Sequence, residues 1–579
     1  MSGLFFQRIL ISSPLIQQYK TIYQRCFSLS VNRLNIKDNI LYNPYKATIP
    51  KLSISEYIYS KIESYCDLTA FECPITHRKF TYGELRKTSR NLSKAFRKKF
   101  GLSKGDVVLI YLVNCPEFPV ACLGCFEAGL VASTVNSLYT SEEVLRQLKD
   151  SSAKLIITSY DLHENAAKAV SQLPTKLPII CVKTKAGQLL PRGAIDFTEI
   201  INSTIDIPDL ELPSPDDLAI LPYSSGTTGL PKGVRLSHSN IVSNMVQTDE
   251  PNSMLQSANA NFQEISPGVL PMFHIYGFTI TTLNLMLKGA KALTLPRFHP
   301  DTFIDCLRQY AISVIFAAPP LILFMTHSPE IKKEYFKHLR TVLSGAAPLG
   351  AKDEEQFRNK AGEQVAILQG YGLTETSPVI SMCKREIQEK FGDATKGSIG
   401  LVVPNTEIKI VEVGSNNGIA LGPNEQGELL VKGPQVMQGY HNNEEATKST
   451  FLDGWFRTGD MAYYDQNELI FITDRVKELI KVKGFQVAPA ELEELLRQHP
   501  HIADAAVIGI PDEISGEIPR AYVKIKEKLN PEDVYNFVAQ KVAKYKRLDG
   551  GIEVVEELPK NSAGKILRRQ LKQRYLDEN

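Results

Sequence analysis

The chain has 579 residues, of which 43% are hydrophobic and 22% are charged, and its formal net charge is +2. By the usual size of protein domains this length allows about four domain-sized units, although fused subdomains often share such a length. The near-neutral balance gives no basic field for nucleic acid over the whole chain. Polar residues or proline break the longest apolar stretches within about fifteen residues, which is too short to span a bilayer. We therefore expect a soluble globular protein with no nucleic-acid partner and no transmembrane segment.

The N-terminal segment, residues 1–37, is basic and contains no acidic residue, since the first acidic side chain is Asp38. Basic residues alternate there with serines and apolar residues, which is the composition of a mitochondrial transit peptide. The stretch "RCFSLS" from Arg25 also resembles a matrix-processing site, with a cut near Phe27 or Ser28. A disordered basic tail is the alternative. The sequence predicts a mitochondrial location, with a cytoplasmic or peroxisomal one as alternatives, although the C-terminal "DEN" does not resemble a peroxisomal signal.

From about residue 80, short β-rich apolar runs alternate with helical patterns, which is typical of an α/β fold. A helix is expected over 141–151, with Ser141 as its cap because two glutamates follow that residue. The strands predicted in this first cycle are 106–113, 154–159, 177–183 and 218–225.

A second cycle of strands and helices follows between about residues 267 and 372, and it predicts a second doubly wound layer. The predicted strands are 267–273, 291–296, 313–320, 340–349 and 365–372, and the predicted helices are 300–311 and 351–362.

After Gly400 the pattern changes to hairpins of β-rich runs at 406–413, 427–433 and 469–475. A charged stretch then leads into a short α+β segment. We predict an α/β fold with a large N-terminal domain of two doubly wound α/β layers plus a β-rich subdomain, followed by a small α+β C-terminal domain. The predicted boundaries are 1–37 for the transit peptide, 38–476 for the N-terminal domain and 477–579 for the C-terminal domain.

Nine cysteines are spread over the chain. Only Cys122 and Cys125 form a close pair, and no second pair or histidine cluster follows at zinc-ligand spacing. We expect reduced, buried thiols.

Residues Tyr223 to Gly233 read "YSSGTTGLPKG". Hydroxyls, bare backbone N–H groups and one lysine suit an anion, and phosphate is the usual one. The stretch fails the common nucleotide-loop pattern GxxxxGK[ST], because Lys232 is followed by glycine where that pattern has a hydroxyl for magnesium. A surface turn rich in small residues is the alternative.

Seven ordered motifs together resemble the adenylate-forming family of acyl-CoA synthetases, 4-coumarate:CoA ligases and beetle luciferases, and most closely its 4-coumarate:CoA ligase branch. In chain order they read "YSSGTTGLPKGV", "LPMFHIYGF", "SGAAPLG", "QGYGLTETSPV", "GWFRTGD", "DRVKELIKVKGFQVAPAELE" and "LPKNSAGKILRR". The resemblance implies a two-step reaction with ATP, Mg²⁺ and coenzyme A. A carboxylate attacks the α-phosphate of ATP to give an acyl-adenylate and pyrophosphate, and the thiol of coenzyme A then displaces AMP.

The resemblance also implies a nucleotide site. Thr374 would contact the α-phosphate, and Glu375 would be the magnesium ligand. Asp460 can accept from both ribose hydroxyls, and the ring of Tyr371 could stack on adenine. The implied ATP/AMP-binding residues are Ser224, Ser225, Gly226, Thr227, Thr228, Lys232, Gln369, Gly370, Tyr371, Thr374, Asp460, Arg475, Lys477, Lys481 and Lys565.

The implied acyl pocket lies near His274, which resembles a gate to the acyl site. Hydroxycinnamate ligases commonly have asparagine in place of Thr279 and lysine in place of Leu343. The absence of this asparagine and this lysine favours a less polar acid as the substrate. A buried polar side chain discriminates strongly between substrates, whereas an apolar pocket wall does not. The implied pocket residues are Tyr276, Thr279, Leu343, Gly345, Ala346, Gly370, Gly372 and Val379.

Two lysine–glycine elements stand in the C-terminal domain, one at Lys483 and Gly484 and one ending at Lys565. The resemblance implies that this domain is mobile and rotates about a pivot at Lys477. Lys565 would then serve adenylation as a catalytic residue, together with Thr374, Glu375 and His274. The implied coenzyme A contacts are Arg297, Lys483 and Gly484.

We therefore expect an AMP-forming acid–thiol ligase that acts on an apolar medium-chain, long-chain or aromatic acid, with ATP, Mg²⁺ and coenzyme A. A 4-coumarate-type ligase and a luciferase-like monooxygenase are the alternatives. A peptide-synthetase module would need a carrier domain, and none is seen after Lys565. The expected partners are small molecules, and the sequence does not indicate an oligomeric state.

Overall fold

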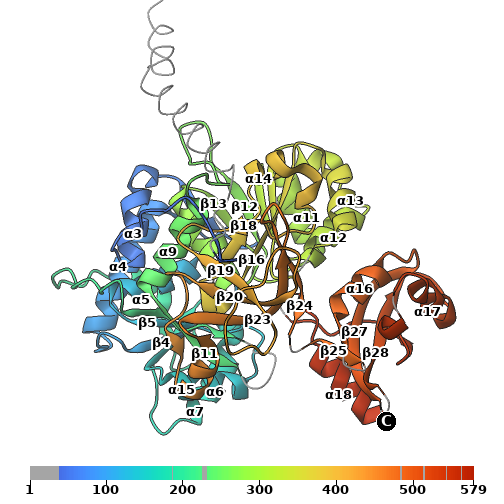
Figure 1. Cartoon of the computed structure of the whole chain (residues 1–579). Helices are drawn as coiled ribbons and strands as arrows, with labels where there is room; N and C mark the ends of the chain where they lie inside the picture. The colour runs from blue at the N-terminus through green and yellow to red at the C-terminus, as the bar shows by residue number, and fades with distance from the viewer. Residues whose placement is uncertain are drawn as a thin grey trace, which may run out of the picture.

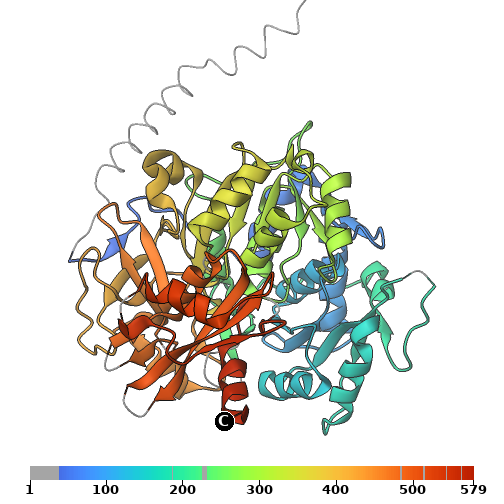
Figure 2. The same ribbon diagram turned by 90° about the vertical axis from the view of Figure 1, so that its right-hand side faces the viewer.

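A computed structural model describes residues 38–578 apart from 186, 225–230, 348, 477, 483–484, 513–514, 543 and 562–563. Figure 1 shows a large body with the orange and red C-terminal part attached to one side of it, next to β24 (Ile470–Arg475). In the view turned by 90° the C-terminal part lies in front of the large body (Figure 2). The predicted transit peptide, residues 1–37, lies outside the described residues.

The first α/β layer is a nine-stranded sheet. Its strands are β4 (Val107–Tyr111), β5 (Val131–Thr134), β6 (Leu155–Ser159), β7 (Ile179–Val182), β8 (Ile195–Asp196), β9 (Leu218–Ile220), β10 (Tyr223–Ser224), β11 (Lys232–Ser237) and β21 (Gly439–Tyr440). Their order is β10-β11-β9-β5-β4-β6-β7-β8, with β21 paired to β11. Every residue of β4 is buried, as expected for a parallel strand whose two faces are covered by helices.

The helices in this half of the chain are amphipathic or buried, and five of the seven, all but α5 and α7, begin at a polar side-chain cap. They are α3 (Ile54–Ile62), α4 (Tyr82–Lys98), α5 (Glu117–Glu127), α6 (Ser141–Ser151), α7 (His163–Ser171), α8 (Phe197–Asn202) and α9 (His238–Asp249). Helix α6 has the predicted bounds, but its cap is Thr140 and not Ser141. The Thr140 side chain accepts from the N–H of Glu143, whose own carboxylate reaches back to the Thr140 N–H, so the glutamate three residues on selects the cap.

The second layer is built from two sheets that meet edge to edge. Their strands are β2 (Thr69–Glu72), β3 (Lys79–Thr81), β12 (Ile265–Gly268), β13 (Lys291–Thr294), β14 (Val314–Ala317), β15 (Thr341–Ser344), β16 (Ala366–Gly372), β17 (Val379–Met382) and β18 (Leu401–Val402). The orders are β12-β13-β2-β3 and β14-β15-β16-β17-β18. Ser313 N donates to Ile265 O over 3.1 Å and joins the two sheets.

Four helices in this half connect or flank these strands, namely α11 (Pro300–Gln309), α12 (Pro319–His327), α13 (Ala351–Ala361) and α14 (Arg385–Phe391), and a short α10 (Leu285–Leu287) precedes β13. The predicted helices 300–311 and 351–362 correspond to α11 and α13. Pro319 and Pro320, which the sequence analysis assigned to the end of a strand, instead begin α12, where a missing N–H does no harm.

The strand predicted over 267–273 is shorter in the structure, where β12 ends at Gly268. The chain beyond it is held by a side chain and not by a neighbouring strand. Asn114 Nδ2 donates to the carbonyls of Gly268 and Leu270 over 3.0 Å each, and Met272 N donates to Asn114 Oδ1 over 2.8 Å. Pro271 supports the same outcome, since proline cannot donate to a sheet ladder.

The predicted β-rich subdomain is a six-stranded sheet in the order β1-β19-β20-β23-β22, with β24 paired to β23. Its strands are β1 (Leu41–Tyr42), β19 (Glu407–Val411), β20 (Gly427–Lys432), β22 (Phe451–Leu452), β23 (Trp455–Tyr464) and β24, and α15 (Glu444–Ser449) precedes β22.

The C-terminal part folds around its own apolar core, which includes Ile480, Leu492, Val507 and Val534. Its sheet has the order β26-β25-β28-β27, with β29 paired to β28. Its elements are β25 (Ile480–Val482), β26 (Phe485–Val487), α16 (Pro489–Arg497), β27 (Ile502–Asp512), β28 (Gly516–Ile525), α17 (Pro531–Ala539), β29 (Ile552–Val554) and α18 (Arg568–Glu578). The predicted boundary residue, Lys477, lies outside the described residues, so the exact boundary stays a prediction.

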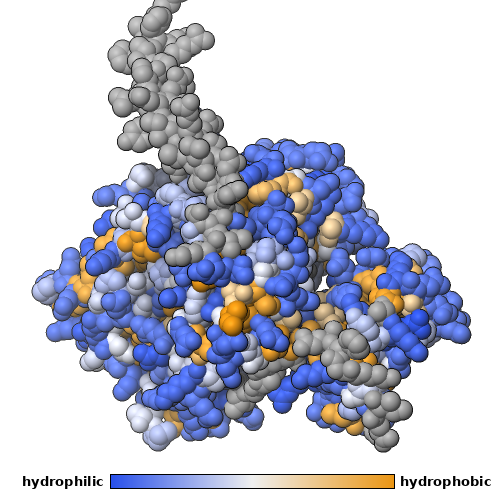
Figure 3. All heavy atoms as spheres, in the orientation of Figure 1, coloured by the Kyte–Doolittle hydropathy of each residue, from blue (hydrophilic) through white to orange (hydrophobic). Residues whose placement is uncertain are grey.

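The space-filling view shows a face that is mainly hydrophilic, with small apolar patches (Figure 3). Scattered single apolar side chains are normal on a protein surface. Within the part of the chain that the structure describes, no helix combines the length and the apolar character needed to cross a membrane. The cysteines of that part are all free thiols, and apart from Cys66 they are buried, as the sequence indicated.

Candidate active site

The phosphate-binding stretch predicted from the sequence is a hairpin. Strands β10 and β11 pair antiparallel, with Ser224 opposite Lys232, so that the glycine- and threonine-rich segment 225–230 connects their ends. Ser225, Gly226, Thr227 and Thr228 themselves lie outside the described residues.

A carboxylate lies beside this hairpin. Glu375 belongs to the short 3-10 turn Thr374–Thr376, which directly follows β16, and it is buried. Its Oε1 accepts from Ser224 Oγ over 3.2 Å and from Tyr440 Oη over 2.9 Å. Lys232 Nζ lies 4.8 Å from the centroid of the Tyr440 ring. One acid, one cation and two hydroxyls are thereby collected at the base of the loop.

These residues fit a magnesium site in which the phosphates of a bound nucleotide would supply further ligands. Within the described residues no group of three or more histidine, cysteine, aspartate or glutamate side chains could hold a metal by itself. Mg²⁺ is usually bound by one or two carboxylates together with substrate phosphates. Glu375 is suited to be that carboxylate, and Lys232 would face the same phosphates.

A second carboxylate, Asp460, connects three strands. It lies on β23 opposite Arg475 of β24, and Arg475 Nε lies 3.0 Å from Asp460 Oδ1. Tyr371 Oη, from the end of β16, donates to Asp460 Oδ2 over 2.6 Å. Burial, followed by the charge of Asp460, raises the pKa of Tyr371 well above its ordinary value, so this phenol keeps its proton. The predicted adenine-stacking residue is therefore anchored to the predicted ribose-binding residue.

Lys565 approaches this group from the C-terminal domain. Burial and then the neighbouring Arg475 lower its pKa to about 8, and Glu478 and Asp460 are close enough to act in the opposite direction. The preceding Gly564 has a positive φ of 79°, and a Cβ at that position would lie 3.0 Å from Pro320 Cγ at the start of α12. The loop that carries Lys565 thus contacts the N-terminal domain directly.

The acyl-site residues lie around a π-helix, Tyr276–Asn284, which follows His274. Such helices are rare and often occur at functional sites. Burial lowers the pKa of His274 to about 4, so the imidazole is neutral at pH 7. Its Nδ1 lies 3.3 Å from the backbone N of Tyr276 and accepts that hydrogen bond, which leaves the proton on Nε2.

The π-helix meets β15 through Tyr276. The Tyr276 hydroxyl donates to the carbonyl of Leu343 over 3.1 Å. A Cβ on Gly345 would lie 3.0 Å from Tyr276 Cε1, so glycine leaves room for the ring. Leu343 is buried, and Thr279 is fully buried with no partner for its Oγ1 among the described residues. The structure therefore brings together a phenol, a leucine and an unpaired hydroxyl.

The remaining predicted pocket residues border the same region. Gly370 is on β16 near Leu343, whose Cδ1 would lie 3.8 Å from an added Cβ. Gly372 approaches the backbone of β17 so closely that a Cβ would lie 1.9 Å from Pro378 O. Val379 is buried at the start of β17, and Ala346 has a positive φ of 70°.

Comparison with known proteins agrees with this geometry. A family model described as AMP-binding enzyme matches residues 59–441, and one described as AMP-binding enzyme C-terminal domain matches residues 491–565. The chain belongs to the AMP-binding enzyme family. The two matches fall on the large body and on the C-terminal part, and Asp460 and Arg475 lie in the segment between them.

Curated relatives cover most of this AMP-binding enzyme. 4-Coumarate--CoA ligase 1 of Solanum tuberosum is 38% identical over 547 residues, which is 92% of this chain and 96% of the relative. 4-Coumarate--CoA ligase 3 of Arabidopsis thaliana is 38% identical over 531 residues, with 90% and 91% covered. These relatives extend the resemblance beyond the seven motifs to nearly the whole chain.

Solved structures share the arrangement of the two parts. ATP-bound MatB from Rhodopseudomonas palustris has a TM-score of 0.80 at 26% identity, with 91% of this chain and 100% of that chain covered. A benzoate CoA ligase from Burkholderia xenovorans has a TM-score of 0.78 at 25% identity, with 90% and 100% covered.

Some predicted residues of the AMP-binding enzyme are not collected at this site. The amide of Gln369 exchanges hydrogen bonds of 3.4 and 3.3 Å with the backbone of Leu349, so it braces the loop after β15. Lys481 is exposed on β25, and its backbone N–H donates to Glu517. Arg297 is exposed after β13. Lys477, Lys483 and Gly484 lie outside the described residues.

Tyr440 is a site residue that the sequence analysis missed. It reaches Glu375 because β21 pairs with β11, with Tyr440 opposite Val234. The partners of this pairing are about two hundred positions apart in the chain, and a two-residue strand carries no periodic pattern. A single tyrosine after glycine gives no signal of its own.

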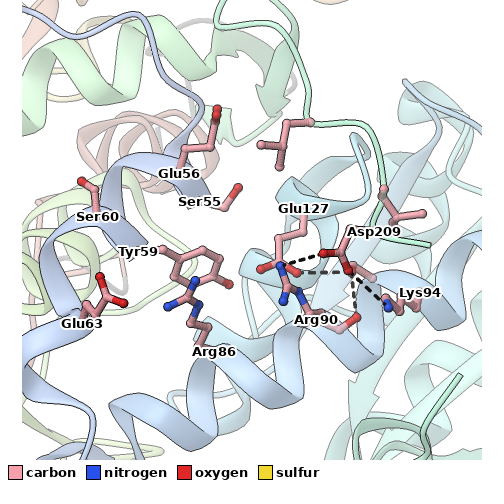
Figure 4. Close-up of a pocket in the computed structure, with 13 residues that line it drawn as sticks. Ser55, Glu56, Tyr59, Ser60, Glu63, Arg86, Arg90, Lys94, Glu127 and Asp209 are labelled. Carbon is pink, nitrogen blue, oxygen red and sulfur yellow. Dashed lines mark hydrogen bonds and ion pairs between the residues drawn. The ribbon is translucent and has the colours of Figure 1, made fainter. Parts of the chain in front are cut away.

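A separate cavity of about 320 Å³ opens between α3 and α4 of the AMP-binding enzyme. Figure 4 shows that Arg86, Arg90 and Lys94 follow one another along α4. Asp209 Oδ2 lies 3.5 Å from Arg90 Nη2, and Asp209 Oδ1 lies 3.3 Å from Lys94 Nζ. The carboxylate of Asp209 therefore neutralises much of the positive charge of the side chains that line the cavity. None of its lining residues belongs to the candidate active site, and we assign it no part in the reaction.

Proposed function

We propose that this AMP-binding enzyme is an ATP-dependent acyl-CoA synthetase that activates an apolar carboxylic acid and transfers the acyl group to coenzyme A. One observation carries the proposal: the loop that holds Lys565 in the C-terminal domain packs against Pro320 of the N-terminal domain, and the buried lysine senses the charges of Arg475 and Asp460. A cation of one domain is thereby brought near the carboxylate and guanidinium that resemble nucleotide contacts in the other. The relatives are named as CoA ligases, and these names support the same reaction class.

In the first half-reaction the acid carboxylate attacks the α-phosphate of ATP, and pyrophosphate leaves. Two anions approach each other, so preorganised cations and donors would stabilise the transition state. This chain offers Lys565, Lys232 and the hydroxyls of the 224–228 loop. Mg²⁺ held by Glu375 and the phosphates would neutralise charge on the nucleotide. Asp460 would fix the ribose, as its place beside Tyr371 and Arg475 allows.

In the second half-reaction the thiol of coenzyme A attacks the acyl carbonyl, and AMP leaves. Arg297, Lys483 and Gly484 remain the predicted contacts of coenzyme A. The resemblance implies that the C-terminal domain turns between the two steps. The packing of the Gly564 loop against α12 supports a part for Lys565 in the first step.

The class of acid follows from the residues around Tyr276. Leu343 presents an apolar side chain, and no charged group is among the predicted pocket residues, which favours an aliphatic or unsubstituted aromatic acid. A 4-coumarate-type ligase is the second candidate, and two observations favour it. The curated relatives with that name are 38% identical, and the Thr279 hydroxyl, which has no partner among the residues that the structure describes, could bind a ring substituent.

A panel of acids separates these candidates. The full chain would be assayed for ATP-dependent consumption of coenzyme A with medium-chain and long-chain fatty acids, benzoate, cinnamate and coumarate. We expect aliphatic or unsubstituted aromatic acids to exceed coumarate in kcat/KM, and Leu343→Lys to shift the preference toward hydroxylated rings. A wild type that prefers coumarate would overturn the apolar assignment. Photon counting with ATP and luciferin would reveal a luciferase-like monooxygenase.

We also propose that residues 1–37 direct the chain to mitochondria. The support is compositional, since the segment is basic, rich in serine and free of acidic residues. A fusion of residues 1–40 to a fluorescent reporter should enter mitochondria. The control is the same fusion with glutamate in place of Arg8, Lys20 and Arg25. Diffuse cytosolic fluorescence of the unchanged fusion would contradict the proposal.

A further inference from the structure

The loop that carries Lys565 is closed at its base by backbone hydrogen bonds. Leu567 N donates to Pro559 O over 2.8 Å, and Asn561 N donates to Lys565 O over 2.9 Å. Lys565 N in turn donates to Asn561 Oδ1 over 2.8 Å. These bonds join the described residues on the two sides of the loop to each other.

Arg568 follows this loop at the first position of α18, and its side chain is only 12% exposed. Its Nη2 donates to both carboxylate oxygens of Glu493 over 2.8 and 2.7 Å, and its Nε approaches Glu493 Oε1 at 3.2 Å and Val507 O at 3.3 Å. Its Nη1 donates to Glu478. One guanidinium therefore uses its three nitrogens on partners in three different segments.

The partners of Arg568 are themselves held in place. Glu493 of α16 also accepts from the N–H of Val507 over 2.8 Å, which ties it to β27. Glu478 stands one position after Lys477, and its backbone N–H donates to Arg475 O over 2.9 Å. A continuous set of contacts thus leads from Arg475, at the candidate nucleotide site, through Glu478 and Arg568 to the base of the Lys565 loop.

We propose that Arg568 is a positioning residue for the adenylation half-reaction, and that its ion pair with Glu478 holds the Lys565 loop against the nucleotide site. The inference rests on the proposed acyl-CoA synthetase function. Arg568 itself is three positions from Lys565 and is occupied by Glu478 and Glu493, so it acts through the lysine and not on the substrate. Its planar fork suits the task, because the bonds of Nη2 and Nε to Glu493 fix the direction of the guanidinium and leave Nη1 facing Glu478.

A purely structural ion pair is the competing explanation. Breaking a buried pair usually destabilises the whole fold, because one charge is left without compensation. Such a loss would lower both half-reactions together. A positioning role would lower adenylation alone, and it would depend on the presence of Lys565.

The variants are Arg568→Gln, the charge-preserving Arg568→Lys and Glu478→Gln, with Arg569→Gln as the matched control. Arg569 is the next residue and is exposed. For each, pyrophosphate release from acid and ATP is measured apart from thioester formation from supplied acyl-adenylate, together with the melting temperature. We expect Arg568→Gln to lose tenfold or more in adenylation kcat, with the thioester step within about twofold of wild type. Arg568→Lys should recover part of the loss.

A double-mutant cycle with Lys565→Ala gives the decisive comparison. If Arg568 acts through Lys565, then Arg568→Gln should lower adenylation little further once the lysine is gone. Additive losses, or equal losses in the two half-reactions, would overturn the proposal. Should Arg568→Gln fail to fold, the same cycle is run with Glu478→Gln, which keeps the guanidinium and its pairing with Glu493.

A readout that needs no activity separates this proposal from the proposed function. The pH dependence of amine labelling at Lys565, followed by mass spectrometry, reports the pKa of that lysine. Loss of the Glu478 charge by itself would lower this pKa, whereas release of the loop to solvent would raise it from about 8. We expect Glu478→Gln to raise it. A fall would overturn the positioning role even if no acid were found to be a substrate.

Discussion

At the scale of single residues, Lys565 is the group on which the proposed adenylation step depends most directly. We expect Lys565→Ala to reduce acyl-adenylate formation by about a hundredfold to a thousandfold, the usual loss for one such electrostatic contact. Thioester formation from supplied acyl-adenylate should survive. Rapid-quench measurement of each half-reaction checks this. Lys560→Ala, in the same loop but paired with Asp504, is the control. Equal loss of both steps in Lys565→Ala would show that one rigid arrangement serves the whole reaction.

The depressed pKa of Lys565 gives a second prediction at this scale. Burial and Arg475 hold it at about 8 in the ligand-free protein, and ATP phosphates beside the amine would raise it again. At pH about 9, between this value and the ordinary lysine value of about 10.4, ATP binding should therefore take up a proton. At pH about 6.5 the amine is already charged, and uptake at this site should vanish.

Calorimetry of ATP binding in two buffers with different ionisation enthalpies measures this proton uptake. Lys565→Ala should remove it at pH about 9 while ATP still binds through Asp460 and Glu375. Uptake that is unchanged in Lys565→Ala would place the titrating group elsewhere and would contradict the assignment.

The sequence predicted many of these residues, because the motifs hold them at fixed spacing. It could not predict how they pair. Asp460 was expected to bind the ribose and Tyr371 to stack on adenine, and the hydrogen bond of 2.6 Å between them was not foreseen. Gln369 was predicted as a nucleotide contact, and the bond of its amide with the backbone of Leu349 was not foreseen. Such pairings depend on which strands become neighbours, and a spacing within one motif does not contain that information.

At the scale of elements, the π-helix Tyr276–Asn284 positions His274, Tyr276 and Thr279. Gly277 permits its close approach to the preceding turn, because a Cβ there would lie 2.0 Å from Pro271 O and 2.6 Å from Pro271 C. Backbone atoms cannot move aside cheaply. We expect Gly277→Ala to destabilise the protein by about 1–3 kcal/mol, as overpacking usually does. The acid kcat/KM should fall tenfold or more.

Gly422→Ala is the control for this prediction. The nearest atom to a Cβ at Gly422 is Glu425 Oε2 at 3.3 Å, the end of a flexible side chain. Thermal melts and steady-state kinetics on both variants test the predicted losses of stability and of acid kcat/KM. A Gly277→Ala protein with unchanged melting temperature and unchanged acid kcat/KM would show that the π-helix can shift without affecting the site.

Elements were more predictable than their ends. The alternation of apolar runs identified β4, β6, β7, β14, β15 and β16 and the helices α6, α11 and α13, because buried parallel strands have a strong apolar signal. The π-helix was not predicted, since its hydrogen-bond pattern leaves no distinct period in a uniformly buried segment. The early end of β12 was missed for another reason, because Asn114 from the first layer satisfies the backbone that follows it.

At the scale of the whole molecule, the C-terminal domain is docked with Lys565 toward the nucleotide site, and α16 lies against the start of α13. A Cβ at Gly350 would lie 3.6 Å from Glu494 Oε1 across this contact. The backbone φ of Gly350 is −65°, so another residue fits there. Cysteines in place of Gly350 and Glu494 could therefore be joined by a short reducible crosslinker in the arrangement seen here.

If the domain must rotate between the half-reactions, such a link should separate them. The crosslinked protein, with Cys66 and Cys26 replaced by serine, should release pyrophosphate from acid and ATP in a single turnover at nearly the rate of the uncrosslinked protein. It should form little thioester after coenzyme A is added, because the Lys483 face could not approach the acyl-adenylate. Reduction of the crosslinker should restore thioester formation, and each single-cysteine variant treated with the reagent should behave as wild type. Undiminished thioester formation by the crosslinked protein would mean that coenzyme A reaches the acyl carbonyl in this same domain arrangement, and the assignment of Lys483 and Gly484 to the thioester step would then fall.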